Sequence, residues 1–123
     1  MTPPIFPLVA ASLDVQAIFG STPVRFYSFG RVPENTPYPY AVWQLSTGAP
    51  ENYLGQRPDV DSLSVQVDVY AQAPGDARSG GEALRDAIEG AAHITLFRGE
   101  ERDPSTNAFR VGFNCDFWVP RAP

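Results

Sequence analysis

The chain of 123 residues contains no lysine, one cysteine and one histidine, and each scarcity excludes a class of chemistry. Cys115 has no partner for a disulfide within the chain, and its place in a strand-like run favours a small buried side chain over a nucleophile. His93 has no second histidine to complete a metal pair and no nucleophile in a recognisable setting. Zinc-ligand spacing, phosphate-binding glycine loops and dinucleotide fingerprints are also absent. We therefore expect no catalytic residue, no metal and no cofactor.

Long apolar runs and a basic N-terminal leader are missing as well. A membrane-spanning helix needs about 18 or more consecutive apolar residues, and a secretory signal begins with a positively charged segment. Neither pattern occurs in the sequence. We expect a soluble protein with no membrane contact, made inside a cell.

The charge of the chain is acidic, with nine arginines against fourteen aspartates and glutamates and a net charge of −5. Binding to duplex DNA without regard to sequence depends on a clustered basic face, so this balance argues against it. All the basic residues are arginine and none is lysine, which has two explanations. One is codon usage, and the other is that rigid guanidinium groups serve protein interfaces.

A chain of this length fits one domain, over residues 1–123, and buries roughly two thirds of its unfolded surface. Apolar spacing predicts a broken helix from about Pro4 to Phe19 and a helix after Pro74, with Asp76 as its N-cap. Gly80 and Gly81 inside that second helix suggest a close approach of its backbone to a sheet, and a frayed helix is the competing explanation.

Strand patterns account for most of the remaining sequence. The clearest is Leu63–Ala71, where apolar and polar residues alternate strictly. The other predicted strands are Val24–Phe29, Tyr40–Thr47, Ile94–Arg102 and Ala108–Val119. This order favours an α+β domain with a mostly antiparallel sheet and two helices packed on one face. The polar face of that sheet is then free.

Two long connections stand out between the strands. Residues 30–39, here called the proline arch, contain three prolines that fix φ and bias their neighbours toward extended geometry, so we expect a stiff segment. The plainest interpretation of the proline arch is an ordinary connection between strands. The second segment, Gly48–Asp61, is rich in turn residues and is predicted to be a long loop.

Charged side chains gather at the end of the strand that reaches Arg102. Glu100, Glu101 and Asp103 include paired carboxylates, which in principle can act as general acid and base. At a hairpin turn, a solvated or interface-facing cluster is the more probable arrangement. Arg98, Arg102 and Arg110 lie close enough in sequence to form ion pairs with these carboxylates, within or between subunits.

Three segments of the chain form a recognisable pattern through their order and spacing. They are Arg31-Val32-Pro33 with Pro37-Tyr38-Pro39-Tyr40-Ala41-Val42-Trp43, then Val65–Ala71 leading to Ala77-Arg78, and last Glu101-Arg102-Asp103 with Phe109-Arg110 and Asp116-Phe117-Trp118-Val119. Together these segments resemble the tail-completion, or tail-terminator, family of long-tailed bacteriophages. The resemblance spans roughly residues 5–119, and the order and spacing of the segments make it more specific than any one of them.

The resemblance implies a structural virion protein rather than an enzyme. Members of the family form a ring, commonly a hexamer, which sits on the last ring of the tail tube, ends tail elongation and presents a surface to the head connector. The implied partners are the chain itself, the tail tube protein and the head–tail connector or neck proteins. DNA passes through without specific binding, and the place of action is the tail or neck of the virion, after synthesis in the host cytoplasm.

We expect the contacts of such a ring in three groups of residues. The proline arch would form a fixed intersubunit surface, and the Gly48–Asp61 connection would contact the neighbour or the tail tube. Acidic side chains would suit a weakly repulsive channel for DNA, with Glu100, Glu101 and Asp103 as the residues to test. The candidate interface residues are Arg31, Pro33, Glu34, Pro37, Tyr38, Pro39, Glu51, Tyr53, Arg57, Asp59, Arg98, Glu100, Glu101, Arg102 and Asp103.

Two alternatives remain open from the sequence. A head-completion or neck adaptor protein has a similar size and also works as a ring. A small ligand-binding or enzymatic α+β domain would have the same elements, because a fold does not fix a function.

Overall fold

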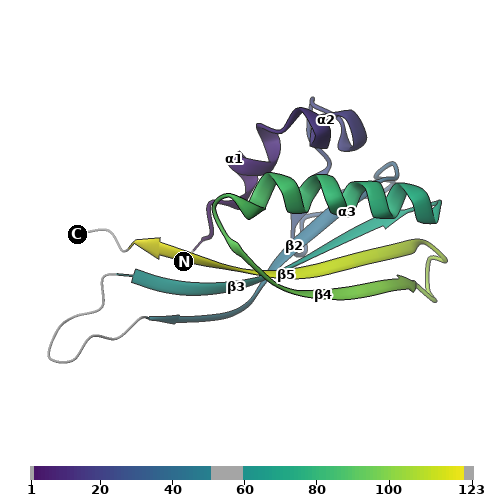
Figure 1. Ribbon diagram of the computed structural model, residues 1–123. Coiled ribbons are helices and arrows are strands. Elements are labelled where there is room, and N and C mark those ends of the chain that lie inside the picture. The colour runs from purple at the N-terminus through teal and green to yellow at the C-terminus, as the bar shows by residue number, and fades with distance from the viewer. Residues whose placement is uncertain (1, 51–59, 121–123) are drawn as a thin grey trace, which may run out of the picture.

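The computed structural model describes residues 2–50 and 60–120, which form a five-stranded sheet and three helices (Figure 1). The strand order is β1-β2-β3-β5-β4, with β1 parallel to β2 and every other neighbouring pair antiparallel. The predicted α+β class with a mostly antiparallel sheet is confirmed. In chain order the elements are α1 (Ile5–Ala10), α2 (Leu13–Phe19), β1 (Phe26–Ser28), β2 (Tyr40–Pro50), β3 (Val60–Ala71), α3 (Pro74–Glu89), β4 (His93–Arg102) and β5 (Phe109–Pro120).

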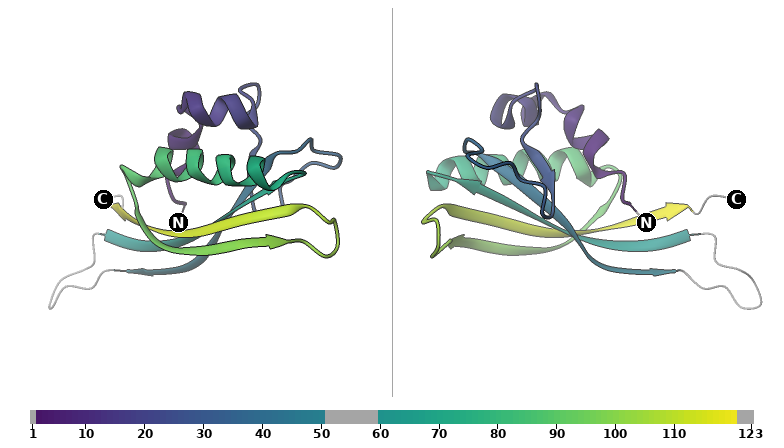
Figure 2. Two further views of the ribbon diagram at one scale, coloured as in Figure 1. Left: turned by 45° about the vertical axis from the view of Figure 1, so that its right-hand side comes forward. Right: turned by 180° about the vertical axis from the view of Figure 1, so that it is seen from behind.

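The helices form a layer on one side of the sheet, and the other side carries no described helix (Figures 1 and 2). The predicted broken helix is two short helices, so the described chain has three helices rather than two. Ser12 makes the break: its hydroxyl accepts a hydrogen bond from the backbone N–H of Val15 at 3.3 Å and caps the start of α2. Gly20 then ends α2 with a φ of 86°, as the sequence predicted.

The core lies between the helices and one face of the sheet. Leu63, Val65, Val67, Val69 and Ala71 of β3 are all fully buried, which confirms the alternation of that strand. Alternate residues of β5 join them from the next strand. Because successive side chains of a strand point to opposite faces, the polar residues between them lie on the face away from the helices, here called the open face.

The helix α3 lies close against the sheet at its two central glycines. A Cβ atom at Gly80 would lie 2.8 Å from Cζ of Phe19 and 3.0 Å from Cγ1 of Val69, and one at Gly81 would lie 2.9 Å from Cγ1 of Val111. Real Cβ atoms do not approach other heavy atoms so closely. The glycines therefore allow the contact, as predicted, and the frayed-helix explanation is wrong.

Two local predictions are wrong. The β2 strand continues through Gly48 to Pro50, and β3 begins at Val60, so both ends of the predicted Gly48–Asp61 loop are strand. Ten registered pairs between β2 and β3, from Tyr40 to Pro50 on β2, override the turn-forming character of these residues. A bulge between Leu45 and Thr47 absorbs the change in register.

The N-cap of α3 was the second error. Ala73 occupies the cap without a side-chain hydrogen bond, and Pro74 is the first helical residue. Proline suits this position because its fixed φ is already helical and its missing N–H has no partner there. Asp76 lies within the first turn instead, where its negative charge favours the positive end of the helix.

Candidate interaction surfaces

The proline arch lies at the β1 side of the sheet, and Arg25 holds the end of it that leads into β2. Nε of Arg25 donates a hydrogen bond to the carbonyl of Pro39 at 2.9 Å, and its Nη2 donates to the carbonyl of Ile18 at 3.2 Å. One guanidinium thus ties the end of the arch to the end of α2. Gly30 and Asn35 have φ angles of 79° and 59°, which glycine and asparagine tolerate best, so the bends of the arch fall where the sequence permits them.

The predicted contact residues of the arch differ in exposure. Arg31, Pro33, Glu34 and Pro37 are exposed, and Tyr38 and Pro39 are half-buried. The ring of Tyr38 stacks on Tyr40 with centroids 5.5 Å apart. Tyr40 in turn stacks on Tyr70 of β3 at 5.3 Å. The arch therefore joins the open face through a row of three tyrosines, a contact that sequence reasoning missed.

The second predicted group lies outside the described residues. Glu51, Tyr53, Arg57 and Asp59 all belong to the segment 51–59. The structure shows only that this segment joins β2 to β3.

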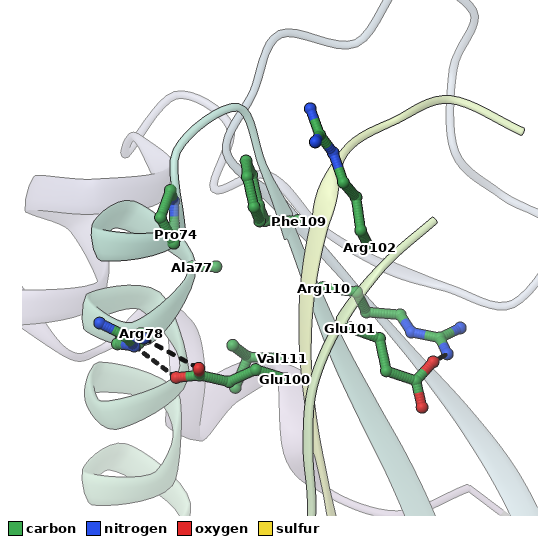
Figure 3. A pocket seen from close by; sticks show the side chains of 9 residues that line it. All are labelled: Pro74, Ala77, Arg78, Glu100, Glu101, Arg102, Phe109, Arg110 and Val111. Carbon is green, nitrogen blue, oxygen red and sulfur yellow. Dashed lines mark hydrogen bonds and ion pairs between the residues drawn. The ribbon is translucent and has the colours of Figure 1, made fainter. Parts of the chain in front are cut away.

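The charged cluster of β4 does not form one surface. Glu100 points toward the helix layer and forms a two-pronged ion pair with Arg78 of α3, whereas Glu101 turns away from the helices and pairs with Arg110 of β5 (Figure 3). The hydrogen bond from Arg78 lowers the pKa of Glu100, which therefore stays ionised. The two carboxylates lie on opposite sides of the strand, so they are no acid–base pair.

Arg98 spans the open face and is the best-anchored charge of β4. Its Nη1 lies 3.0 Å from Oδ1 of Asp68. Its Nε donates to Oδ1 of Asn114 at 2.8 Å and its Nη2 to the carbonyl of Val67 at 2.9 Å. A Cβ atom at Gly112 would lie 2.6 Å from Nη2 of Arg98, so the glycine makes room for this side chain. The edge strand is thereby fastened across β5 to β3.

The remaining two predicted residues shape the hairpin between β4 and β5. The guanidinium of Arg102 lies 4.9 Å from the ring centre of Phe109, within the range of a cation–π contact. Oδ1 of Asp103 accepts hydrogen bonds from the backbone N–H and the hydroxyl of Ser105, at 2.9 Å and 2.8 Å. These bonds lower the pKa of Asp103. Both residues act in the turn itself, which matches the predicted hairpin.

Two adjoining hollows lie between α3 and the β4–β5 pair, of about 310 and 290 Å³. Both are lined by Arg78, Glu100 and Val111. The first also touches Phe109 and Arg110 (Figure 3). The charged groups that line them include the ion pairs of Arg78 with Glu100 and of Arg110 with Glu101. Neither hollow brings together a nucleophile and a base.

The open face carries ordered polar contacts between strands. Nε2 of Gln44 donates to Oε1 of Gln66 at 2.6 Å, and the hydroxyl of Ser64 donates to Oδ1 of Asp116 at 2.7 Å. The strict alternation of β3 was the signal that could have placed Ser64 and Gln66 on the open face. Their partners, Gln44 and Asp116, depend on the order of the strands, in which β3 lies between β2 and β5.

Both edges of the sheet are incompletely covered. Within the described residues β4 pairs only with β5, and its Leu96 and Phe97 are 53% and 61% exposed. At the other edge, β1 pairs with Ala41 to Trp43 alone, so the second half of β2 has only β3 beside it in the described chain. Leu45, in that half, is 41% exposed.

Other chemistry finds little support in the described residues. Among them no three histidine, cysteine, aspartate or glutamate side chains gather as a metal site. None of the helices there is long and apolar enough to cross a membrane. Cys115 is buried, and desolvation raises the pKa of its thiol to about 12, so it is an unreactive core residue as predicted.

Comparisons with known proteins identify the family of the chain. The family model described as "Tail completion protein gp17" matches residues 3–120. None of the curated proteins matches the chain. A chain of the solved structure "Virion of native gene transfer agent (GTA) particle" has the same fold, with 16% sequence identity and a TM-score of 0.66 over 95% of this chain and 92% of that one. The alternative of a small enzyme is thereby set aside, and the chain belongs to the tail completion protein gp17 family, as a structural protein of phage tails.

Proposed function

We propose that the protein forms a homo-oligomeric ring, a hexamer, on the last ring of the tail tube, where it ends tail elongation and offers the surface to which the head is joined. The observation that carries this proposal is the family match, which extends over residues 3–120 and therefore over every described element of the fold. The likeness in fold to a chain of a gene transfer agent virion agrees with it.

The shape of the subunit suits a closed ring. A ring of identical subunits needs a heterologous interface, in which one surface meets a different surface of the neighbour. The described chain has two unlike edges on opposite sides of the sheet, β4 on one and β1 with the proline arch on the other. Each could meet the other without using the open face.

The proline arch is suited to the intersubunit contact because it is already ordered. Arg25 fixes its end, and the stacked rings of Tyr38, Tyr40 and Tyr70 join it to the sheet. Ordering a flexible loop on assembly lowers affinity, and a preformed loop avoids most of that loss. The exposed side chains of Arg31 and Glu34 are then the polar contacts of the arch.

The open face is the natural lining of a DNA channel in this proposal. Its charges are largely balanced, because Asp68 pairs with Arg98 and Glu101 pairs with Arg110. A surface without a basic cluster does not hold the phosphate backbone, so DNA would pass without being trapped. Glu100 points to the helix side and drops out of the proposed lining.

The runner-up function is a neck adaptor that binds the head portal. It uses the same ring and differs only in its first partner. Purified protein mixed separately with tail tubes and with portal-bearing heads distinguishes the two. Binding to tubes supports a tail terminator, and binding to heads alone supports an adaptor.

Electron microscopy of tails assembled without this protein tests the leading proposal. A terminator stops growth, so its absence is expected to give tails of abnormal length that carry no heads. Supplying the purified protein during assembly should restore uniform length and head attachment. Tails of normal length with normal heads in its absence would refute the proposal.

A further inference from the structure

The β4 strand exposes apolar side chains on both of its faces. Leu96 pairs in register with Asn114 on the open face, whereas Phe97 pairs with the buried Phe113 on the helix side and lines the hollow under α3. The two side chains are 53% and 61% exposed. An edge strand of a soluble protein is usually protected by charge, proline, a bulge or a covering element. The register of β4 shifts between Ile94 and Leu96 and again between Phe97 and Gly99, but Leu96 and Phe97 between these shifts are apolar and exposed, and an apolar edge invites pairing. A helix would cover one of these side chains, but an added strand covers both.

The opposite edge offers a matching stretch of backbone. The N–H of Phe29 donates to the carbonyl of Trp43 at 2.9 Å, and the pairing of β2 with β1 ends there. The segment Gln44–Pro50 continues as strand with β3 on one side and no described strand on the other. Leu45 is 41% exposed at this open half of β2, and Phe29, which follows β1, is 73% exposed. Apolar side chains thus border both unpaired stretches.

Strand directions allow the two edges to meet. The strands β2, β3, β5 and β4 alternate in direction, so β4 runs opposite to β2 within one subunit. A rotation about an axis roughly along the strands leaves these directions unchanged. The β4 of one subunit would therefore face the β2 of the next in antiparallel orientation, which continues the alternation of the sheet.

We propose that β4 of one subunit pairs with the open half of β2, Gln44–Pro50, in its neighbour, so that one sheet continues from subunit to subunit. This inference rests on the ring proposed above and names the surfaces that build it. The occupant of each edge is a second copy of this chain. The contact is heterologous, and every junction uses one β4 edge and one β2 edge.

Two edge variants make this arrangement testable. Leu96→Lys places a charge on the β4 edge, and Leu45→Lys places one on the open half of β2, where lysine is a common block to strand pairing. Leu13→Lys is the matched control, because Leu13 is 78% exposed and belongs to α2 rather than to β4 or β2. Circular dichroism and urea unfolding check that each variant folds, and mass is measured by light scattering after chromatography, with and without purified tail tubes.

The decisive sample is the mixture of the two variants. Each variant alone lacks one half of every junction, so each is expected to lose ring formation and stay a monomer. Mixed in equal amounts, they retain a single good junction, the β4 edge of one with the β2 edge of the other. The expected product is a heterodimer of twice the 13.4 kDa subunit mass and nothing larger. The wild type and Leu13→Lys should form rings.

The outcomes separate this inference from the proposed function. If the wild type forms rings and both edge variants do so as well, or if the mixture stays monomeric, the edge pairing is overturned and the ring stands. If the wild type forms no ring even with tail tubes, the ring and the edge pairing fall together. Should an edge variant not fold, hydrogen exchange of the wild type decides: slower exchange in β4 and in Gln44–Pro50 on assembly supports the pairing, and unchanged exchange in both overturns it.

Discussion

The close seating of α3 on the sheet can be tested by adding one methyl group at Gly80. In an open helix interior, glycine to alanine stabilises by about 1 kcal/mol. Here the new Cβ would lie 2.8 Å from Cζ of Phe19 and 3.0 Å from Cγ1 of Val69. Both neighbours are fully buried and cannot turn away into solvent. Such overpacking costs about 1–3 kcal/mol. The two effects combine to a net loss of about 0–2 kcal/mol in the free energy of unfolding.

A control in the same helix separates the two effects. A Cβ atom at Gly75 meets nothing within 4 Å, so Gly75→Ala should gain the helix-forming benefit, up to about 1 kcal/mol, without the clash. The difference between the two variants then isolates the overpacking, about 1–3 kcal/mol. Urea unfolding followed by circular dichroism measures it. In thermal unfolding it corresponds to roughly 4 °C per kcal/mol for a domain of this size.

The result that would refute this reasoning is equal stabilisation by both substitutions. It would mean that α3 moves away from Phe19 and Val69 at little cost. Gly81→Ala repeats the test at an independent contact, because its Cβ would meet Cγ1 of Val111 at 2.9 Å. A loss at Gly81 without a loss at Gly80 would place the tight contact on β5 alone.

Three further predictions concern single sites. Gly112→Ala should displace Arg98 from its cradle and speed hydrogen exchange in β4; unchanged exchange would contradict the fastening of this edge. Arg78 lowers the pKa of Glu100, so the contribution of this carboxylate to stability is present above its ordinary pKa of 4.5 and is lost as pH falls through the lower folded-state pKa. Glu100→Gln should therefore reduce the loss of unfolding free energy that urea titrations measure as the pH is lowered. An equal loss in the wild type and the variant would contradict this. Cys115, with its pKa raised to about 12, should resist alkylation at pH near 8 until urea unfolds the chain; labelling of the native protein would show that the core opens.

Local patterns predicted the elements whose burial is one-sided. The alternation of β3 and the apolar odd positions of β5 follow directly from one face on the core and one face free. The break at Ser12 was visible as well, because the capping residue precedes a helical stripe. The predictions that failed concern segments whose conformation is decided by pairing with another strand. Gly48 and Pro50 read as turn residues, yet ten registered pairs hold their strand against β3.

The charged residues near Arg102 illustrate the same limit at the candidate surface. Neighbours in sequence, Glu100 and Glu101 were expected in one cluster, but a strand sends them to opposite faces and each meets its own arginine. Arg98 was expected beside these carboxylates. Instead it reaches Asp68, thirty residues earlier in the chain, because β5 inserts between β4 and β3 and Gly112 leaves a gap to cross.

Strand order also bears on how the protein can assemble. From the sequence, β4 is one of several half-buried strands, and nothing marks Leu96 and Phe97 as different from core residues. Once β4 is known to be an edge strand, the same two side chains are exposed apolar groups, which in a monomer would remain in contact with water. The short β1 leaves half of β2 open in the same way. An assembly surface of this kind is a property of the sheet, which only the order of its strands reveals.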